Sequence, residues 1–431
     1  MREKRFLLWS ALVVLMLLPA LAGVAGGRQE KVTLTVMNYA QVEKAFVIIN
    51  ETFMKAHPNV NIVYEPTPYD NYQQKYGAII ATKSGPDVMM NELFWCYDTA
   101  DAYVPLNDKL KSEPQVFEDL LAYNMMYRYM DPNGPLCWLP LSYNGNVMYY
   151  NKEILKQAGV NPENPATSWE EFGRVCEAVK RIGKAPVAMA GAQEVPLLWN
   201  WPETQKNYWK SEQDILEFGR GKIPWTDPRM LNGLKLFASM ADKGWFQQGW
   251  QTIQGIPDAL DLFSSGGAAF IGSIISDVAN WKQYEEALGQ EKVGVMLWPA
   301  VDPANPMMKK FSGFQGFQHG ITKWSRHPKE AWEYIKFLAS AEGGNLFLKH
   351  AGGQPINKKF DRSIAGGSPN FAKIQQIIQN NLVQVVLLMS SREIDALARG
   401  WSQYGTGGIT VEEWSKMLQD ALDQSRDKKL K

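Results

Sequence analysis

The sequence has few of the residues that build metal centres and disulfide frameworks. Its 431 residues include four histidines and only three cysteines, Cys96, Cys137 and Cys176. The cysteines are too far apart for a zinc site or a Cys-x-x-Cys redox pair, and their odd number argues against a disulfide framework. The sequence is compatible with one disulfide and one spare thiol. The favoured interpretation is that the three cysteines act separately as small apolar residues. No histidine pair has metal-ligand spacing, so no metal site is expected.

An excess of either charge is also lacking, as are the common catalytic motifs. Lys plus Arg and Asp plus Glu number 45 each, so no basic stripe for nucleic acid is indicated. The chain contains no Gly-x-Ser-x-Gly, no Gly-x-x-x-x-Gly-Lys and no Gly-x-Gly-x-x-Gly. Two carboxylates that are distant in sequence can still be brought together by folding and act as a catalytic pair. A secreted carbohydrate-active enzyme therefore stays an alternative. We favour a binding protein with no catalytic residue, no cofactor and no nucleic-acid partner.

Long apolar runs are absent except at the N-terminus. Residues 6–18 are apolar apart from Ser10, follow a basic start, and precede Pro19 and a series of small residues. This order is typical of a secretory signal peptide, predicted over 1–27. The alternative, a membrane anchor, needs about 20 apolar residues. No cysteine follows for lipid attachment, so we expect an exported, periplasmic, soluble protein.

The rest of the chain is too long for one ordinary domain, because single cores seldom exceed roughly 250–300 residues. Two lobes are therefore expected. Alternating apolar residues predict strands, and apolar residues at helical spacing predict helices, in the order strand 32–37, helix 42–56, strand 59–64, helix 72–80 and strand 87–90. Such β-α-β-α-β order is typical of an open α/β sheet.

The α/β pattern continues through the second half of the chain. Another α/β stretch begins near 147–151, and Ser168 with Glu171 forms a capping box that begins a helix. Further helices are predicted at 323–341, 374–389 and 411–422. The predicted fold class is therefore α/β throughout.

Two loops of the first stretch are candidates for a ligand site. Ligands of open α/β sheets bind beyond the carboxyl ends of the strands. Here those ends are the loops 39–41 and 91–95, which are rich in amides, carboxylates and rings. We expect these loops to contribute to a binding site.

A series of short phrases, each weak alone, occurs in order over some four hundred residues. They are His57-Pro58-Asn59-Val60, Pro68-Tyr69-Asp70-Asn71-Tyr72, Gly85-Pro86-Asp87-Val88, Leu139-Pro140-Leu141-Ser142-Tyr143-Asn144, Tyr149-Tyr150-Asn151-Lys152, Ser168-Trp169-Glu170-Glu171-Phe172, Gly266-Gly267-Ala268-Ala269-Phe270, Lys329-Glu330-Ala331-Trp332-Glu333 and Gly352-Gly353-Gln354-Pro355. With these phrases the chain resembles the family 1 extracellular solute-binding proteins of bacterial ATP-driven importers, in the carbohydrate-binding branch typified by maltodextrin-binding protein.

The resemblance implies a two-lobe periplasmic-binding-protein fold, with three interlobe crossings and a ligand cleft between the lobes. The N-terminal lobe would contain 28–141 plus 300–343, and the C-terminal lobe 145–298 plus 346–431. Crossings are expected near Ser142–Asn144, Trp298–Pro299 and Gly343–Gly344. Such joints allow lobes to open and close about a ligand.

The resemblance also implies a set of ligand-binding residues. In that family, loops at the strand ends, the crossings and an aromatic segment line the cleft. The corresponding positions here are Tyr39, Gln41, Asn91, Glu92, Trp95, Tyr143, Asn144, Trp199, Trp201, Ser273, Phe314, Gln315 and Arg392.

One departure from the family pattern affects the choice of ligand. The family often has Gly-x-Trp where this chain has Gly272-Ser273-Ile274, so one sugar-stacking ring is missing. Other rings remain near amides and carboxylates, a combination that suits the apolar faces and hydroxyl rims of sugars. We therefore expect a sugar receptor that delivers its ligand to membrane permease subunits of an ABC importer and is monomeric. A non-sugar solute bound by the same fold stays open.

Overall fold

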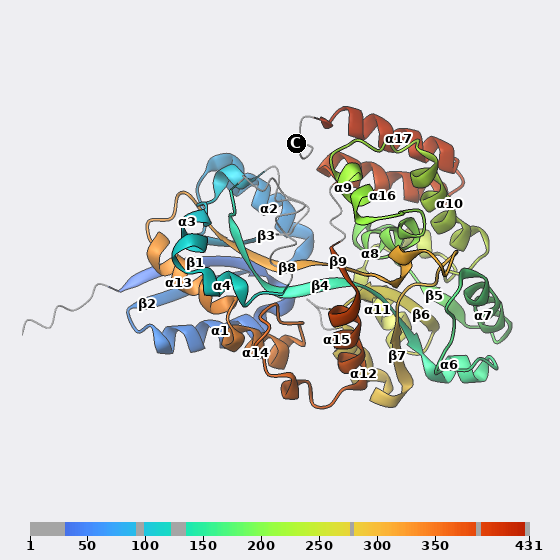
Figure 1. Ribbon diagram of the computed structural model, residues 1–431, viewed down its shortest axis with the longest axis horizontal. Coiled ribbons are helices and arrows are strands. Elements are labelled where there is room, and N and C mark those ends of the chain that lie inside the picture. Colours follow the sequence, from blue (N-terminus) through green and yellow to red (C-terminus); the bar gives the residue numbers. More distant parts are fainter. Residues whose placement is uncertain (1–30, 92–98, 122–134, 276–279, 385–388, 427–431) are drawn as a thin grey trace, which may run out of the picture.

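Two α/β halves lie side by side, and two long strands run between them (Figure 1). These strands are β4 (Trp138–Asn151) and β8 (Phe311–Ile321). The arrangement is the two-lobe α/β fold that the sequence predicted. The computed structural model describes residues 31–91, 99–121, 135–275, 280–384 and 389–426. The predicted signal peptide lies outside these residues.

The bounds of the regular elements follow the chain. The other strands are β1 Val32–Tyr39, β2 Val60–Thr67, β3 Val88–Asn91, β5 Ala185–Ala188, β6 Ala268–Ile274, β7 Val293–Met296 and β9 Leu382–Gln384. The helices are α1 Glu43–Ala56, α2 Tyr69–Thr82, α3 Asn107–Ser112, α4 Pro114–Glu118, α6 Lys152–Gln157, α7 Trp169–Arg181, α8 Glu194–Lys206, α9 Glu212–Gly219, α10 Pro228–Asp242, α11 Ile256–Ser264, α12 Asn280–Leu288, α13 Pro328–Leu338, α14 Ala341–Ala351, α15 Pro369–Asn381, α16 Ser391–Gly405 and α17 Val411–Asp423.

All the strands connect through β4 and β8. The main strand order is β2-β1-β3-β8-β4-β6-β5, with β7 paired to β4 and β9 paired to β8. The first part of β4 pairs antiparallel with β8, whereas its last residues pair with β6 and β7. One continuous strand therefore belongs to the sheets of both halves.

The first half confirms the predicted β-α-β-α-β order. Strand β1 pairs parallel with both β2 and β3, as crossover helices α1 and α2 require. Helix α1 buries Phe46, Ile49 and Phe53, which recur at helical spacing and face the sheet. Because His57 and Pro58 follow, the helix ends at Ala56.

The capping box predicted in the second half is confirmed. The Ser168 side chain accepts from the Glu171 amide, and the Glu171 carboxylate accepts from the Ser168 amide, so α7 begins at Trp169. Helix α8 packs against α10, and α16 packs against α17. In Figure 1 these four helices lie in the upper part of the right-hand half.

Three chain segments lie side by side where the halves meet. Tyr143 pairs with Gln315 across β4 and β8. On the other edge of β4, the Tyr143 amide donates to the Gln354 carbonyl at 2.8 Å, and the Ile356 amide donates to the Leu141 carbonyl at 3.1 Å. We call the segments 142–144, 314–316 and 354–356 the joint.

The joint differs from the crossings expected at Trp298–Pro299 and Gly343–Gly344. Both glycines lie in the first turn of α14, not in an extended segment. They serve close packing, because a Cβ on Gly344 would lie 2.9 Å from the Cβ of Pro355. Trp298 is buried before β8 begins. The lobe boundaries drawn from the resemblance stay a prediction.

Two predicted helices are shorter than the periodicity indicated. The helix expected over 323–341 begins at Pro328, because proline favours the first turn of a helix and disfavours its interior. The helix expected over 374–389 ends at Asn381, and the backbone then forms β9 beside β8. The closing helix at 411–422 is confirmed as α17.

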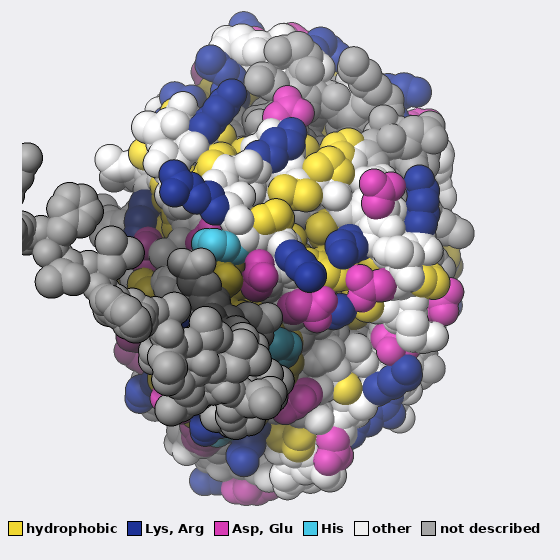
Figure 2. Space-filling model, turned by 90° about the vertical axis from the view of Figure 1, so that its left-hand side faces the viewer, with side chains coloured by type: hydrophobic (Ala, Val, Ile, Leu, Met, Phe, Trp, Pro, Cys, Tyr) yellow, Lys and Arg dark blue, Asp and Glu magenta, His cyan; other side chains and the backbone are white. Residues whose placement is uncertain are grey.

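Charges of both signs are interspersed on the surface shown in Figure 2, where neither sign forms a stripe. This agrees with the balanced composition of the chain. Within the described ranges, no helix is both long and apolar enough to cross a membrane.

Candidate functional site

A line of polar side chains crosses the sheet at the joint. It consists of Asn91 at the end of β3, Gln318 on β8, and Ser142, Asn144 and Asn146 on β4, and we call it the polar row. Asn91 pairs directly with Gln318, and Gln318 pairs with Pro140 of β4. Because side chains alternate along a strand, the three β4 members share the face of Pro140 and Gln318. The polar row therefore spans both halves on one face.

The polar row is buried although much of it makes no hydrogen bond. Asn91 and Ser142 are fully buried, and Asn146 is 4% exposed. Among the described residues, no partner exists for either polar atom of the Asn91 amide, for Ser142 Oγ or for Asn146 Oδ1. A buried polar group without a partner costs about 1–3 kcal/mol. Each such group calls for an explanation, and a ligand or a water that supplies the missing partner is one.

Helix α8 adds another amide beside the polar row. Asn200 is 2% exposed, and its Nδ2 donates to the carbonyls of Pro196 at 2.5 Å and Gly272 at 3.4 Å. Its Oδ1 has no partner. Gly272 pairs with Met148 on the face of the polar row, and a Cβ there would lie 2.0 Å from Asn200 Oδ1. The glycine is therefore required for this amide to approach the sheet.

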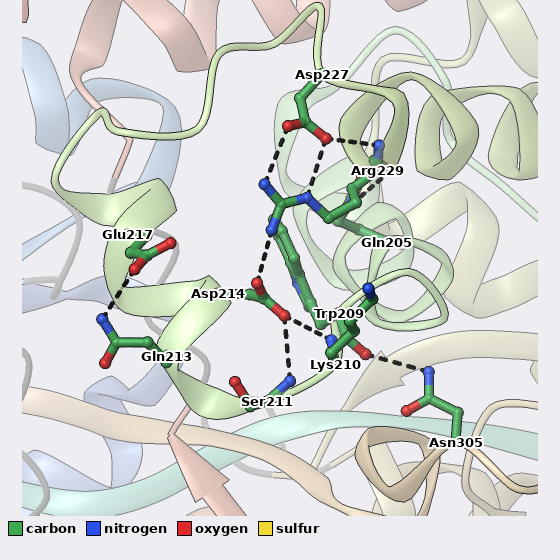
Figure 3. Close-up of polar contacts among 10 residues, drawn as sticks. All are labelled: Gln205, Trp209, Lys210, Ser211, Gln213, Asp214, Glu217, Asp227, Arg229 and Asn305. Carbon is green, nitrogen blue, oxygen red and sulfur yellow. Dashed lines mark hydrogen bonds and ion pairs between the residues drawn. The ribbon is translucent and has the colours of Figure 1, made fainter.

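A charged network fixes the segment that follows α8 (Figure 3). The Arg229 guanidinium donates to Asp214 Oδ1 at 2.7 Å and to both carboxylate oxygens of Asp227 at 3.0 Å. The hydrogen bonds from Arg229 lower the pKa of Asp227. Gln205, in the last turn of α8, donates to the Arg229 carbonyl at 3.0 Å. The network thus ties α8 to α9 and α10.

The polar row carries no titratable group. The nearest titratable group described on β8 is His319, which follows Gln318. The His319 ring lies on the opposite face of the sheet, where its Nε2 is 3.2 Å from the Asn38 side-chain amide. Burial lowers the pKa of His319 to about 3, so it is neutral near pH 7. The amides and the hydroxyl of the polar row are themselves uncharged and suit a ligand rich in hydroxyl groups, because each hydroxyl both donates and accepts.

Three residues expected at the site lie on the face of the polar row. Asn91 and Asn144 are members of it, and Phe314 pairs directly with Asn144. Phe314 is half-buried. Trp199, on α8 beside Asn200, is also half-buried. Phe314 therefore keeps some exposed surface on the face of the polar row, and Trp199 keeps some exposed surface on α8.

Three other expected residues lie on the opposite face of the sheet. Tyr143 and Gln315 form a directly opposed pair one residue away from Asn144 and Phe314. Ser273 pairs with Val147, which also alternates away from the polar row. The alternation of side chains along strands therefore separates them from Asn91 and Asn144.

Trp201 is buried in the core, not exposed at an open cleft. Its indole is 1% exposed and packs against Trp225, with ring centroids 5.3 Å apart. The helix turns by about 100° per residue, so Trp199 and Trp201 point in different directions. This arrangement favours a structural role for Trp201.

None of the remaining expected residues belongs to the polar row, and some of them lie outside the described ranges. Tyr39 is packed against Tyr72 at 4.6 Å between centroids. Gln41 is exposed after β1. Arg392 is exposed on α16 and donates to Gln424 of the segment after α17 at 3.3 Å. Glu92 and Trp95 lie outside the described residues, as does Cys96.

Ser142, Asn146, Gln318 and Asn200 were not predicted as site residues. A signal for the first two was present, since Ser142, Asn144 and Asn146 alternate with apolar residues in a strand that is otherwise hydrophobic. No local signal marks Gln318 or Asn200, because their positions depend on strand register and helix packing. Cys137 and Cys176 are buried and free. In the described part of the chain, no cluster of three metal-ligand side chains was found.

In sequence, the chain is similar to known binding proteins. A family model described as bacterial extracellular solute-binding protein matches residues 39–345. A putative binding protein of Brucella abortus (strain 2308) is 26% identical over 344 residues, which cover 76% of this chain and 77% of that protein. The sn-glycerol-3-phosphate-binding periplasmic protein UgpB of Agrobacterium fabrum is 29% identical over 235 residues, half of each chain.

The fold is also similar to that of a solved sugar complex. The maltose-bound protein MalE3 of T. maritima superimposes with a TM-score of 0.75 at 20% sequence identity. The superposition covers 91% of this chain and 99% of that chain. At this identity the similarity concerns the fold.

Proposed function

The chain belongs to the family of bacterial extracellular solute-binding proteins, and from that premise we propose that it captures a sugar and delivers it to the membrane permease of an ABC importer. The family consists of binding proteins, not enzymes, so the bound sugar leaves unchanged. We also propose that the protein is exported to the periplasm, in keeping with the family description.

The unpaired polar atoms of the polar row carry this proposal. Asn91, Ser142, Asn146 and the neighbouring Asn200 offer uncharged acceptors, and Asn91 and Ser142 also offer donors. Sugar hydroxyls would satisfy both kinds of group without bringing a charge into the buried sheet. We propose these four residues with Asn144 as hydroxyl partners, and Phe314 and Trp199 as rings for apolar faces. Glu92 and Trp95 follow Asn91 directly and are proposed with it.

Closure of the two halves would complete the site. Asn91 lies in the first half. In the second half, Asn146 pairs with β6, and the Asn200 side chain donates to a carbonyl of β6. A ligand that touches both sets binds best when the halves are close together, so it shifts the population towards the closed state. We propose that the joint accommodates this motion and separates the two predicted lobes.

A phosphorylated polyol is the second candidate, because one relative is named for sn-glycerol-3-phosphate. Its hydroxyls would suit the same amides. A phosphate is usually paired with arginine, lysine or a helix N-terminus, and the polar row contains no cation. The composition of the polar row therefore favours a neutral sugar.

A thermal-shift screen with the mature protein separates the candidates. A ligand of the native state at a hundred times its dissociation constant raises the free energy of unfolding by about 2.7 kcal/mol. We expect neutral mono- or oligosaccharides to raise the melting temperature and sn-glycerol-3-phosphate to leave it unchanged. Stabilisation by the phosphate alone would contradict the sugar proposal, and calorimetry would confirm each hit.

A further inference from the structure

A cavity of about 270 Å³ lies on the face of β4 opposite the polar row. Tyr143 contributes one wall, and the segment from Gln354 to Arg362 contributes another. Leu121 and the end of α15 complete it. Because Tyr143 alternates with Ser142 and Asn144 along β4, the cavity and the polar row lie on different sides of the same strand.

The inner surface of the cavity is apolar. Tyr143, Ile356 and Ile378 are at most 3% exposed, and Leu121 and Phe360 also line the space. Small-molecule sites typically enclose about 300–1,000 Å³. This cavity is slightly smaller than that range, so it suits a single ring or a short branched chain.

The lining of the cavity combines four amide side chains, those of Gln354, Asn357, Gln375 and Gln379, with two basic ones. Lys358 and Arg362 line it, and none of its lining residues is acidic. Arg362 is exposed, and its guanidinium carbon lies 5.9 Å from the centre of the Phe360 ring. A carboxylate placed here would meet two cations at the edge of an apolar chamber.

We propose that this cavity is a second ligand site that takes a small amphipathic carboxylic acid. An aromatic or branched aliphatic body contacts Tyr143, Ile356 and Ile378, and the carboxylate lies towards Lys358 and Arg362. The occupant contacts the joint itself, since Tyr143 and Ile356 belong to two of its three segments. The site is distinct from the polar row and does not depend on which solute the row binds.

Calorimetry with phenylacetate and its neutral analogue phenylacetamide tests the assignment on the mature full-length protein. We expect saturable one-to-one binding of phenylacetate and at least fivefold weaker binding of the amide. Arg362→Gln should weaken phenylacetate binding by about fivefold. The matched change Arg181→Gln, at an exposed arginine on α7 outside the cavity, should leave it unchanged.

Two further variants block the space directly. Ile378→Trp fills the interior, and Gln379→Trp covers the edge from an exposed position that does not disturb the core. Both should abolish phenylacetate binding while the thermal melt of Gln379→Trp stays close to that of the wild type. The proposal is overturned by absence of saturable phenylacetate binding, by equal binding of acid and amide, or by full binding to Gln379→Trp.

Discussion

Lys206 and Glu203 form an ion pair inside α8, with both side chains fully buried and Nζ 2.6 Å from Oε2. Lys206 also donates to the Lys310 carbonyl at 2.8 Å and to Ser312 Oγ at 3.2 Å. The pair therefore connects the helix that presents Asn200 to the beginning of β8, which carries Phe314 and Gln318.

Removing one member of this pair should be severely destabilising. Lys206→Met leaves the Glu203 carboxylate buried without its cation, and such losses cost about 3–5 kcal/mol of unfolding free energy. Lys206→Met combined with Glu203→Leu should recover most of that loss, because no buried charge remains. Urea unfolding of both variants measures the difference, and equal stability of the single and double variants would show that the pair is not coupled.

The polar row should matter for binding more than for stability. Asn91→Ala removes a donor and an acceptor that are unpaired in the ligand-free structure, so it should weaken sugar binding by about fivefold to tenfold. The melting temperature of the free protein should stay constant or rise. Calorimetric titration and thermal melting of one preparation provide both values.

Asn50 is a matched control for Asn91. It is also a buried asparagine in the first half, but its Oδ1 accepts from Tyr334 Oη at 2.7 Å in the core. Asn50→Ala should lower stability by about 1–3 kcal/mol and leave the affinity of the folded protein unchanged. The reverse pattern for the two variants would contradict the assignment of the polar row.

The order of elements in the first half and the start of α7 in the second half could be predicted because each of these elements carries its own sequence pattern. Phe46, Ile49 and Phe53 have helical spacing, and Ser168 with Glu171 caps a helix through contacts only three residues apart. These features depend on local sequence, so the structure contains them as predicted. The length of the chain predicted two lobes, and the family resemblance added the crossings and the ligand cleft between them.

Features that depend on distant partners could not be predicted in the same way. Strand β9 continues an apparently helical pattern, and it forms because Leu382 pairs with Phe311, about seventy positions earlier in the chain. The face on which Tyr143 or Ser273 lies is set by strand register. The resemblance named both Asn144 and its neighbour Tyr143 as ligand-binding residues, whereas the alternation along β4 puts their side chains on opposite faces.

The two tryptophans that flank Asn200 should respond differently to truncation. Trp201→Ala removes a ring buried against Trp225, so it should lower the free energy of unfolding by about 3–5 kcal/mol. Trp199→Ala changes a half-buried ring and should cost less stability while weakening sugar binding. Melting and titration of the two variants test this. A Trp201→Ala protein of normal stability with weakened binding would instead make Trp201 a ligand-stacking ring.

His319 should make stability depend on pH in a definite window. Burial lowers the pKa of His319 in the folded protein from the ordinary value of 6.5 to about 3. Between pH 6.5 and pH 3 the unfolded chain therefore binds a proton that the native protein does not. The stabilising effect is complete above pH 6.5 and is lost as the pH falls towards 3, by about 1.4 kcal/mol per pH unit for one such group. His319→Gln removes this titration and keeps a polar side chain near Asn38. Urea unfolding between pH 7 and pH 4 should therefore show a steeper decline for the wild type than for the variant, and the other titrating groups cancel in the comparison. Parallel declines for the two proteins would mean that His319 is protonated in the native protein at these pH values.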